Sequence, residues 1–307
     1  MKCKWIKKLT AGIIFLAAVG SLSGCQKAAT SENLFRDIEV NMTSVESAEE
    51  NQIVKLQMGD GDSAISQESN LDIEMTRNPA SVHRKGQQKT NMAGTKETQE
   101  MESYQVEEDG KTVIYSGTDE AWEKNAVEEK ETSSQQTVLF DGLQNLSGAF
   151  SVSQDLATVN KEECFELTGT ISGTQFQETF ADTLKALLGE DSSDLSGWNL
   201  QASEDEENNE ELQQKLNNVK VDCVIDIYRN NILPAKITFD LTDYLKAAGE
   251  ENAQVTSYTL EVTFVSYNDT KKIKVPKAVK ESAKDNGEDE AENSTDEMLE
   301  EENQEAT

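Results

Sequence analysis

The sequence predicts an α+β protein built on a large, curved antiparallel sheet, an unclosed β-barrel with helices covering its open concave side. Two observations support this prediction. Apolar and polar residues alternate over most of the chain in runs separated by turn residues, which is typical of antiparallel strands with one covered and one wet face. Stripes with helical spacing occur between the strand groups, and the apolar face of the sheet is the surface available to bury them.

Residues 1–24 have the three-part pattern of a secretory signal: a lysine-rich start, an apolar run and then small residues. The stretch Leu22-Ser23-Gly24-Cys25 resembles a bacterial lipobox, in which a peptidase cuts before the cysteine and the thiol receives diacylglycerol. A plain signal with a chance cysteine and an N-terminal helical anchor are the alternatives. We expect lipidated Cys25 to hold the mature chain on the outer, extracytoplasmic face of the cell membrane, because two acyl chains anchor a protein stably. Residues 25–36 would then form a polar tether.

Residues 37–276 carry the alternation and are predicted to form one β-rich domain. The apolar sets that indicate strands include Ile38, Val40 and Met42; Val54, Leu56 and Met58; Leu71, Ile73 and Met75; Val219, Val221, Cys223, Ile225 and Ile227; Ile237, Phe239 and Leu241; and Tyr258, Leu260, Val262 and Phe264. The Asn230-Asn231 pair is predicted to turn a hairpin between 219–229 and 232–241. Residues 102–127 predict a three-stranded meander with a tight turn at Asp109-Gly110.

Three segments have helical spacing instead. The apolar side chains of 174–188 fall on one stripe, and Gly189 is a suitable C-terminal cap. Shorter stripes occur in 136–147 and 209–219. Because these segments lie between strand groups, we expect them to pack on the apolar face of the sheet.

The chain is strongly acidic, with 28 basic and 59 acidic residues and a formal net charge of −31. This charge excludes nucleic acid as a partner, since phosphate would be repelled. It also disfavours adsorption to anionic lipid head groups, so an acyl anchor would have to supply membrane attachment. Residues 190–211 are predicted to form an exposed acidic loop. Residues 277–307 are predicted to form an acidic disordered tail, with the acids concentrated in 285–307.

Motifs of catalysis are missing from the sequence, which has no nucleophile elbow and no phosphate loop. His83 is the single histidine, and we interpret it as an ordinary surface or strand residue. Asp60 and Asp62 open a run that lacks the later ligands of a calcium loop in register. Cys164 and Cys223 could form one disulfide or two buried free thiols, and they do not make a zinc site. We therefore expect no catalytic residue, metal or cofactor, and we rank a surface hydrolase last.

Several short motifs, together with the lipobox, recur in one known family. They are Tyr104, Asp109-Gly110, Tyr115, Trp122 and Lys124; Tyr228-Arg229 with Leu233-Pro234-Ala235-Lys236; and Ile273-Lys274-Val275-Pro276. On these residues the chain resembles Gram-positive lipoproteins of uncharacterised (DUF) type related to the LolA/LppX-like superfamily. The acidic insertion at 190–211 and the long tail depart from the usual compact form.

The resemblance implies an unclosed antiparallel barrel whose open side is plugged by helices, and it implies the lipid carriage of LolA and LppX relatives. On that basis the ligand-lining or plug residues would be Phe176, Phe180, Leu184, Leu187 and Leu188. A dry core packed by the same side chains is the alternative. Two functions therefore stay open: a lipid-anchored protein that binds a lipid or another apolar ligand, and a lipid-anchored interaction or sensing module for a protein partner.

Overall fold

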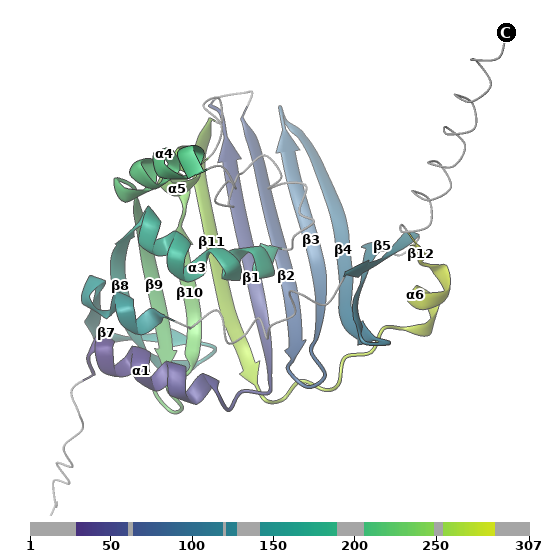
Figure 1. Cartoon of the computed structure of the whole chain (residues 1–307), viewed down its shortest axis with the longest axis horizontal. Coiled ribbons are helices and arrows are strands. Elements are labelled where there is room, and N and C mark those ends of the chain that lie inside the picture. Colours follow the sequence, from purple (N-terminus) through teal and green to yellow (C-terminus); the bar gives the residue numbers. More distant parts are fainter. Residues whose placement is uncertain are drawn as a thin grey trace, which may run out of the picture.

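A single twelve-stranded sheet dominates the computed structural model, which describes residues 29–60, 64–118, 121–127, 142–188, 206–248 and 254–285 (Figure 1). The strand order is β12-β6-β5-β4-β3-β2-β1-β11-β10-β9-β8-β7. The strands are β1 (Ser47–Met58), β2 (Ile65–Thr76), β3 (Ser81–Met92), β4 (Thr95–Glu108), β5 (Lys111–Thr118), β6 (Ala121–Val127), β7 (Phe150–Val159), β8 (Glu162–Ser172), β9 (Lys220–Tyr228), β10 (Pro234–Asp240), β11 (Val255–Tyr267) and β12 (Lys284–Asp285).

Two antiparallel meanders, β1 to β6 and β7 to β11, make up the sheet, and the pairing of β1 with β11 joins them. The register of this central pair runs from Ala48 opposite Tyr267 to Met58 opposite Val255. Short β12 is parallel to β6. Because the edge strands β7 and β12 stand at opposite ends of the order, the described sheet is not closed. The predicted large, unclosed antiparallel sheet is therefore confirmed.

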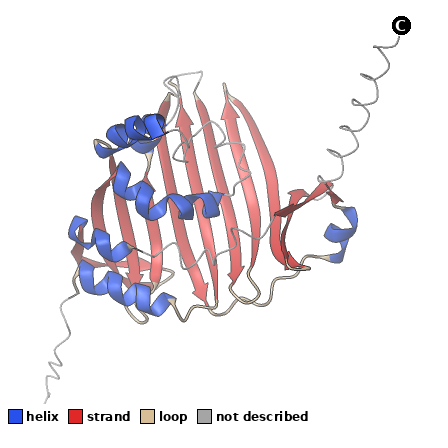
Figure 2. Cartoon of the chain, in the orientation of Figure 1, coloured by secondary structure: helices blue, strands red, loops and turns tan. Residues whose placement is uncertain are grey.

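The helices gather on one face of the sheet, which we call the inner face (Figure 2). They are α1 (Ser31–Met42), the 3-10 helix η2 (Leu143–Ala149), α3 (Gly173–Leu188), α4 (Glu206–Asn217) and α5 (Thr242–Ala248). They lie over β7 to β11 and β1, whereas no described helix lies over β3 and β4 (Figure 1). Helix α6 (Lys277–Ser282) stands apart beside β6. Among the described residues, no helix has the length and apolarity to cross a membrane.

The main core fills the space between these helices and the inner face. Its inner-face members alternate along each strand, as Leu260, Val262 and Phe264 do on β11, all at most 2% exposed. The helices contribute Phe35, which meets Phe150 edge-on at 5.2 Å between ring centroids, together with the buried apolar side chains of the other four helices. Full burial of such a side chain contributes about 1.5–3 kcal/mol, so this core is the main source of stability.

The strand predicted over Ile38, Val40 and Met42 is wrong, because these residues belong to α1. Thr30 caps this helix through its side chain, which accepts a hydrogen bond from the Asn33 N–H. Ile38 and Met42 are buried four residues apart on one helical face, while Val40 is 62% exposed. The helix also corrects the predicted tether 25–36, since residues 31–36 are helical.

The other predicted helices are found with shifted bounds. Helix α3 agrees with the prediction for 174–188, and α4 replaces the last six residues of the predicted loop 190–211 with helix. The described part of 136–147 is 3-10 rather than α-helical. The remaining residues of the predicted helix 136–147 and of the predicted loop 190–211 lie outside the described part of the chain. The predicted hairpin at Asn230-Asn231 is confirmed by the pairing of β9 with β10.

The chain after β11 packs a second apolar cluster on the outer face. Ile273 and Val279 contact Tyr104, Tyr115 and Trp122 of the confirmed meander β4-β5-β6. Residues 277–285 are therefore ordered as α6 and β12, which corrects the start of the predicted disordered tail. Residues 286–307 lie outside the described part of the chain.

Candidate functional site

The plug predicted over α3 is present in its first half. Phe176 and Phe180 are at most 1% exposed, and both rings meet Phe239 of β10 edge-on, at 5.2 and 4.9 Å between centroids. Phe176 also meets Tyr244 of α5 at 5.0 Å. These aromatic contacts hold α3 on the inner face, and at the start of the helix Gln175 accepts a hydrogen bond from the Ser172 N–H of β8.

The remaining predicted site residues cannot be placed in the same way. Leu184, Leu187 and Leu188 belong to α3, but their side chains lie outside the described part of the structure. Cys25 lies outside the described residues as well. Cys164 and Cys223 are buried and free, so the disulfide alternative is excluded.

Two rows of the inner face, those of Leu56 and Val54, change from apolar to polar between β1 and β2. Strand register aligns Tyr258, Leu56, Gln67, Thr90 and Glu97 across β11, β1, β2, β3 and β4 in one row. The next row aligns Leu260, Val54, Ser69, Gln88 and Gln99. The apolar ends of both rows belong to the main core or pack against it. The concave inner face, which we call the trough, is therefore apolar under the helices, and over β2 to β4 it has a polar part in these two rows beside the small apolar cluster of Ile73, Met75 and Val82.

Two polar side chains are buried at the boundary between these parts. Glu50 and Gln52 of β1 are 2% and 1% exposed, and they share the inner face with Val54. Both carboxylate oxygens of Glu50 and the amide oxygen of Gln52 have no hydrogen-bond partner within the described structure. Unpartnered buried acceptors are rare in proteins and need an explanation.

Arg84 of β3 carries an opposite charge that acts on Glu50. Register places Ile73 of β2 between them, with Phe264 on the other side of Glu50. Burial raises the pKa of the Glu50 carboxyl to about 8, and the positive charge of Arg84 opposes that rise. The carboxyl is therefore largely protonated at neutral pH and can donate as well as accept a hydrogen bond.

The outer face carries a separate polar cluster around Glu102 of β4. Its carboxylate accepts hydrogen bonds from the Tyr104 hydroxyl at 2.7 Å and from the Lys85 ammonium at 3.0 Å, and it contacts His83 Nε2 at 3.0 Å. Burial acts to raise the pKa of Glu102, but these three hydrogen bonds outweigh it and lower the pKa. His83 also stacks on Tyr104 at 4.3 Å, so it is a strand residue with a structural role.

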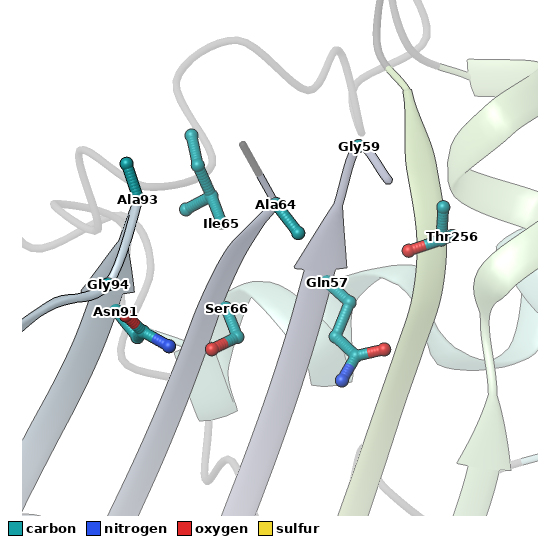
Figure 3. Close-up of a pocket in the computed structure, with 9 residues that line it drawn as sticks. All are labelled: Gln57, Gly59, Ala64, Ile65, Ser66, Asn91, Ala93, Gly94 and Thr256. Carbon is teal, nitrogen blue, oxygen red and sulfur yellow. The ribbon is translucent and has the colours of Figure 1, made fainter. Parts of the chain in front are cut away.

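A pocket of about 480 Å³ lies at the end of β1, β2 and β3 nearest Gly59 (Figure 3). Its lining includes Gln57, Ser66 and Asn91, which pair in register on the outer face, and Thr256 of β11. None of its nine lining residues has an ionisable side chain. No group of three or more metal-ligating side chains occurs among the residues that the structure describes.

Residues 30–284, which contain all of these features, match DUF6612, a family of unknown function. The chain belongs to the DUF6612 family. No curated protein sequence shows a significant match to this DUF6612 chain. The predicted membership of a DUF-type family is confirmed, and lipoprotein status remains a prediction.

Solved structures similar to the DUF6612 chain share little sequence with it. LprF from Mycobacterium bovis is 12% identical with a TM-score of 0.44, and the match covers 80% of this chain and 96% of LprF. The Mycobacterium tuberculosis lipoprotein LppX is 13% identical with a TM-score of 0.40, covering 80% of this chain and 98% of LppX. A LolA superfamily protein from Nitrosomonas europaea is 9% identical with a TM-score of 0.22, covering 82% and 97%.

Sequence reasoning missed Glu50 and Gln52, although the DUF6612 sequence contains a signal for them. They fall in phase with Ala48 and Val54 on an alternating strand, so two polar residues occupy positions of the covered face. Arg84 could not be found in this way, because its position near Glu50 depends on the register of β1, β2 and β3.

Proposed function

We propose that this protein is a membrane-anchored extracytoplasmic lipoprotein, not an enzyme, that binds an apolar ligand such as a lipid in its half-barrel. One observation supports the proposal above the others: an unclosed sheet has an apolar inner half that is covered by helices attached through side-chain packing. Sites for apolar ligands are concave, mostly apolar and bordered by a few polar groups.

Helix α3 is the element that would move to admit a ligand. Apart from a hydrogen bond from the Ser172 N–H of β8 to Gln175 at its start, α3 packs on the sheet through the edge-on contacts of Phe176 and Phe180 with Phe239. Outward movement of α3 would expose the inner-face residues of β9 to β11, which include Ile225, Ile237 and Leu260. An acyl chain would replace the apolar contacts that the helix gives up, so the burial of apolar surface would be retained.

The anchor follows from the predicted lipidation of Cys25. Five residues separate Cys25 from Ser31, the first residue of α1. At full extension such a linker spans about 18 Å, so lipidation would keep the half-barrel close to the membrane surface. A ligand could then pass between the bilayer and the inner face over a short distance.

Direct titration tests ligand binding. The chain from residue 26 onward retains every described element, and after delipidation we expect it to bind a fluorescent diacylglycerol at one molecule per chain. A chain with Val40→Ala, changed on the exposed side of α1, serves as the matched control and should bind equally. Absence of saturable binding in both would contradict the proposal.

The anchoring is tested separately in cells. Radiolabelled palmitate should be incorporated into the full chain, and Cys25→Ala should abolish incorporation and release the protein from membranes. Incorporation that persists in Cys25→Ala would show that the lipobox has been misassigned.

The interaction or sensing module is the second candidate, and the filled core supports it. Phe176, Phe180 and Leu216 are at most 1% exposed, as in a packed interior. If this candidate is correct, the delipidated chain will bind no diacylglycerol while it remains folded and anchored through Cys25.

A further inference from the structure

The polar part of the trough shows which kind of ligand this site can distinguish. Apolar ligands need no hydrogen-bonding groups on the protein. On the inner face, however, the buried acceptors of Glu50 and Gln52 directly adjoin Phe264 and Val262 of the main core. Each unpaired buried acceptor destabilises the folded state by about 1–3 kcal/mol. The three oxygens of Glu50 and Gln52 therefore destabilise the protein unless a ligand or water donates hydrogen bonds to them or accepts from them.

We propose that Glu50 and Gln52, with Arg84 opposite, form a subsite for the uncharged hydroxyl-bearing head group of an amphiphile whose acyl chains lie on the apolar part of the trough. This inference rests on the proposed function and names the ligand class for the same site. The head group would meet the protein at Glu50 and Gln52, next to the rows of Val54 and Leu56, which become polar at Ser69 and Gln67 on β2.

The unpartnered atoms set the hydrogen-bonding character of the head group. All three are oxygens that accept hydrogen bonds: Oε1 and Oε2 of Glu50 and Oε1 of Gln52. Gln52 Oε1 can be satisfied only by a donor, whereas the largely protonated carboxyl of Glu50 can both donate and accept; a hydroxyl group also does both. Ester and ether oxygens only accept, so a triacylglycerol would leave Gln52 Oε1 unpaired and is disfavoured as the ligand.

The charged residues around the subsite determine which head-group charge it can accommodate. A cationic ammonium would be repelled by Arg84, which is close enough to influence the ionisation of Glu50. A phosphodiester would supply only acceptors, so it would leave Gln52 Oε1 unpaired. A neutral polyol, such as glycerol or a sugar, satisfies the acceptors without adding charge to a buried site.

The outward continuation of the subsite fits a sugar or polyol. Leu71 and Gly86 follow Gln52 across β2 and β3, and the next row presents Ser69 and Gln88. Ser69 and Gln88 are half-buried, so they border the space into which a head group would extend. Amide and hydroxyl side chains can each donate and accept, which matches a polyol better than a fixed charge.

The test compares four probes with identical oleoyl chains: monogalactosyl-diacylglycerol, phosphatidylglycerol, a trimethylammonium lipid and trioleoylglycerol. Dissociation constants are measured with the chain from residue 26 onward. We expect the galactolipid to bind at least about tenfold more tightly than trioleoylglycerol, since one satisfied buried hydrogen-bond group is worth about that factor. Tightest binding of phosphatidylglycerol or of the trimethylammonium lipid would overturn the neutral-head assignment.

Variants link this preference to the subsite. Glu50→Met with Gln52→Met should equalise the galactolipid and trioleoylglycerol affinities, because the apolar replacements remove the acceptors while retaining volume. Glu50→Gln keeps hydrogen-bonding groups and should keep the preference. Asp226→Asn is the matched control, because Asp226 is another buried acid with an unpartnered oxygen, on β9 away from the subsite.

The outcomes separate the two levels of the proposal. If all four lipids bind equally and the double variant changes nothing, the subsite is wrong while the proposed function stands. If no lipid binds to the folded chain, the proposed function itself fails. Unfolding curves recorded for each variant show which of them are folded, and Glu50→Gln keeps the test usable if the double variant is not.

Discussion

The ring of Phe180 meets the ring of Phe239 edge-on, with 4.9 Å between centroids and 63° between planes, and this contact fastens α3 to β10. Phe180 is 1% exposed and belongs to the main core. Phe180→Ala should lower the free energy of unfolding by about 3–5 kcal/mol, because it removes apolar burial and leaves a cavity.

Denaturant unfolding measures that loss, with Val40→Ala as a control that should change stability by less than about 0.5 kcal/mol, since Val40 is 62% exposed. Equal effects of the two substitutions would show that α3 does not pack on the sheet as described.

The pH dependence of stability should report the buried Glu50. Its folded-state pKa of about 8 lies above the value for an unfolded glutamate, so between these values the folded state holds a proton that the unfolded state has released. Stability is therefore greatest below the unfolded pKa and falls as pH rises toward about 8, by up to about 1.4 kcal/mol per pH unit.

Glu50→Gln should flatten this decline throughout unfolding curves recorded from pH 5 to pH 8. Burial also raises the pKa of Asp226, to about 6, so Asp226→Asn should flatten only the lower part. A slope unchanged by Glu50→Gln would show that Glu50 is ionised and solvated in the folded protein.

The two cysteines of the sheet should remain reduced and unreactive. Cys164 pairs with Tyr228, whereas Cys223 pairs with Gly169, so the two thiols are offset by about 17 Å along adjacent strands, too far for a disulfide. Burial raises the pKa of Cys164 to about 11 and raises that of Cys223 further, which suppresses the reactive thiolate.

Iodoacetamide labelling followed by mass spectrometry measures this directly on the chain from residue 26 onward. Labelling should be slow in the folded protein and should reach two alkylations in denaturant. Rapid alkylation of the folded chain would place at least one of these cysteines at the surface.

Gly86 marks a close approach of β3 to β2. A Cβ atom added there would lie 1.9 Å from the backbone oxygen of Asn70. Relieving this clash would require the backbone of β2 or β3 to shift, because the clashing atom does not belong to a flexible side chain. Gly86→Ala should therefore destabilise the protein by about 1–3 kcal/mol. Gly148→Ala is the control, because nothing lies within 4 Å of its added Cβ; a neutral Gly86→Ala would show that the strands are farther apart.

Alternation in the sequence was sufficient to predict the strands and the open sheet, because each strand buries one face and turn residues separate the runs. It failed at α1, where Ile38, Val40 and Met42 also alternate. The helical relation of Leu34, Ile38 and Met42 competes with that spacing, and only packing on the core distinguishes the two.

The candidate site was predictable only in part. Phe176 and Phe180 could be found because their spacing describes a helical stripe. The grouping of Glu50 with Arg84 depends on which strands pair and in which register, and pairing between β1 and β11 joins residues about 200 positions apart. Local sequence patterns contain no information about such long-range contacts.

Native mass spectrometry of the chain from residue 26 onward, mixed with equimolar galactolipid and trioleoylglycerol, tests the central claim most directly. We predict a single added mass corresponding to one galactolipid per chain, and equal amounts of the two lipid adducts when Glu50 and Gln52 are both replaced by methionine. A folded wild-type chain that retains neither lipid would contradict the account.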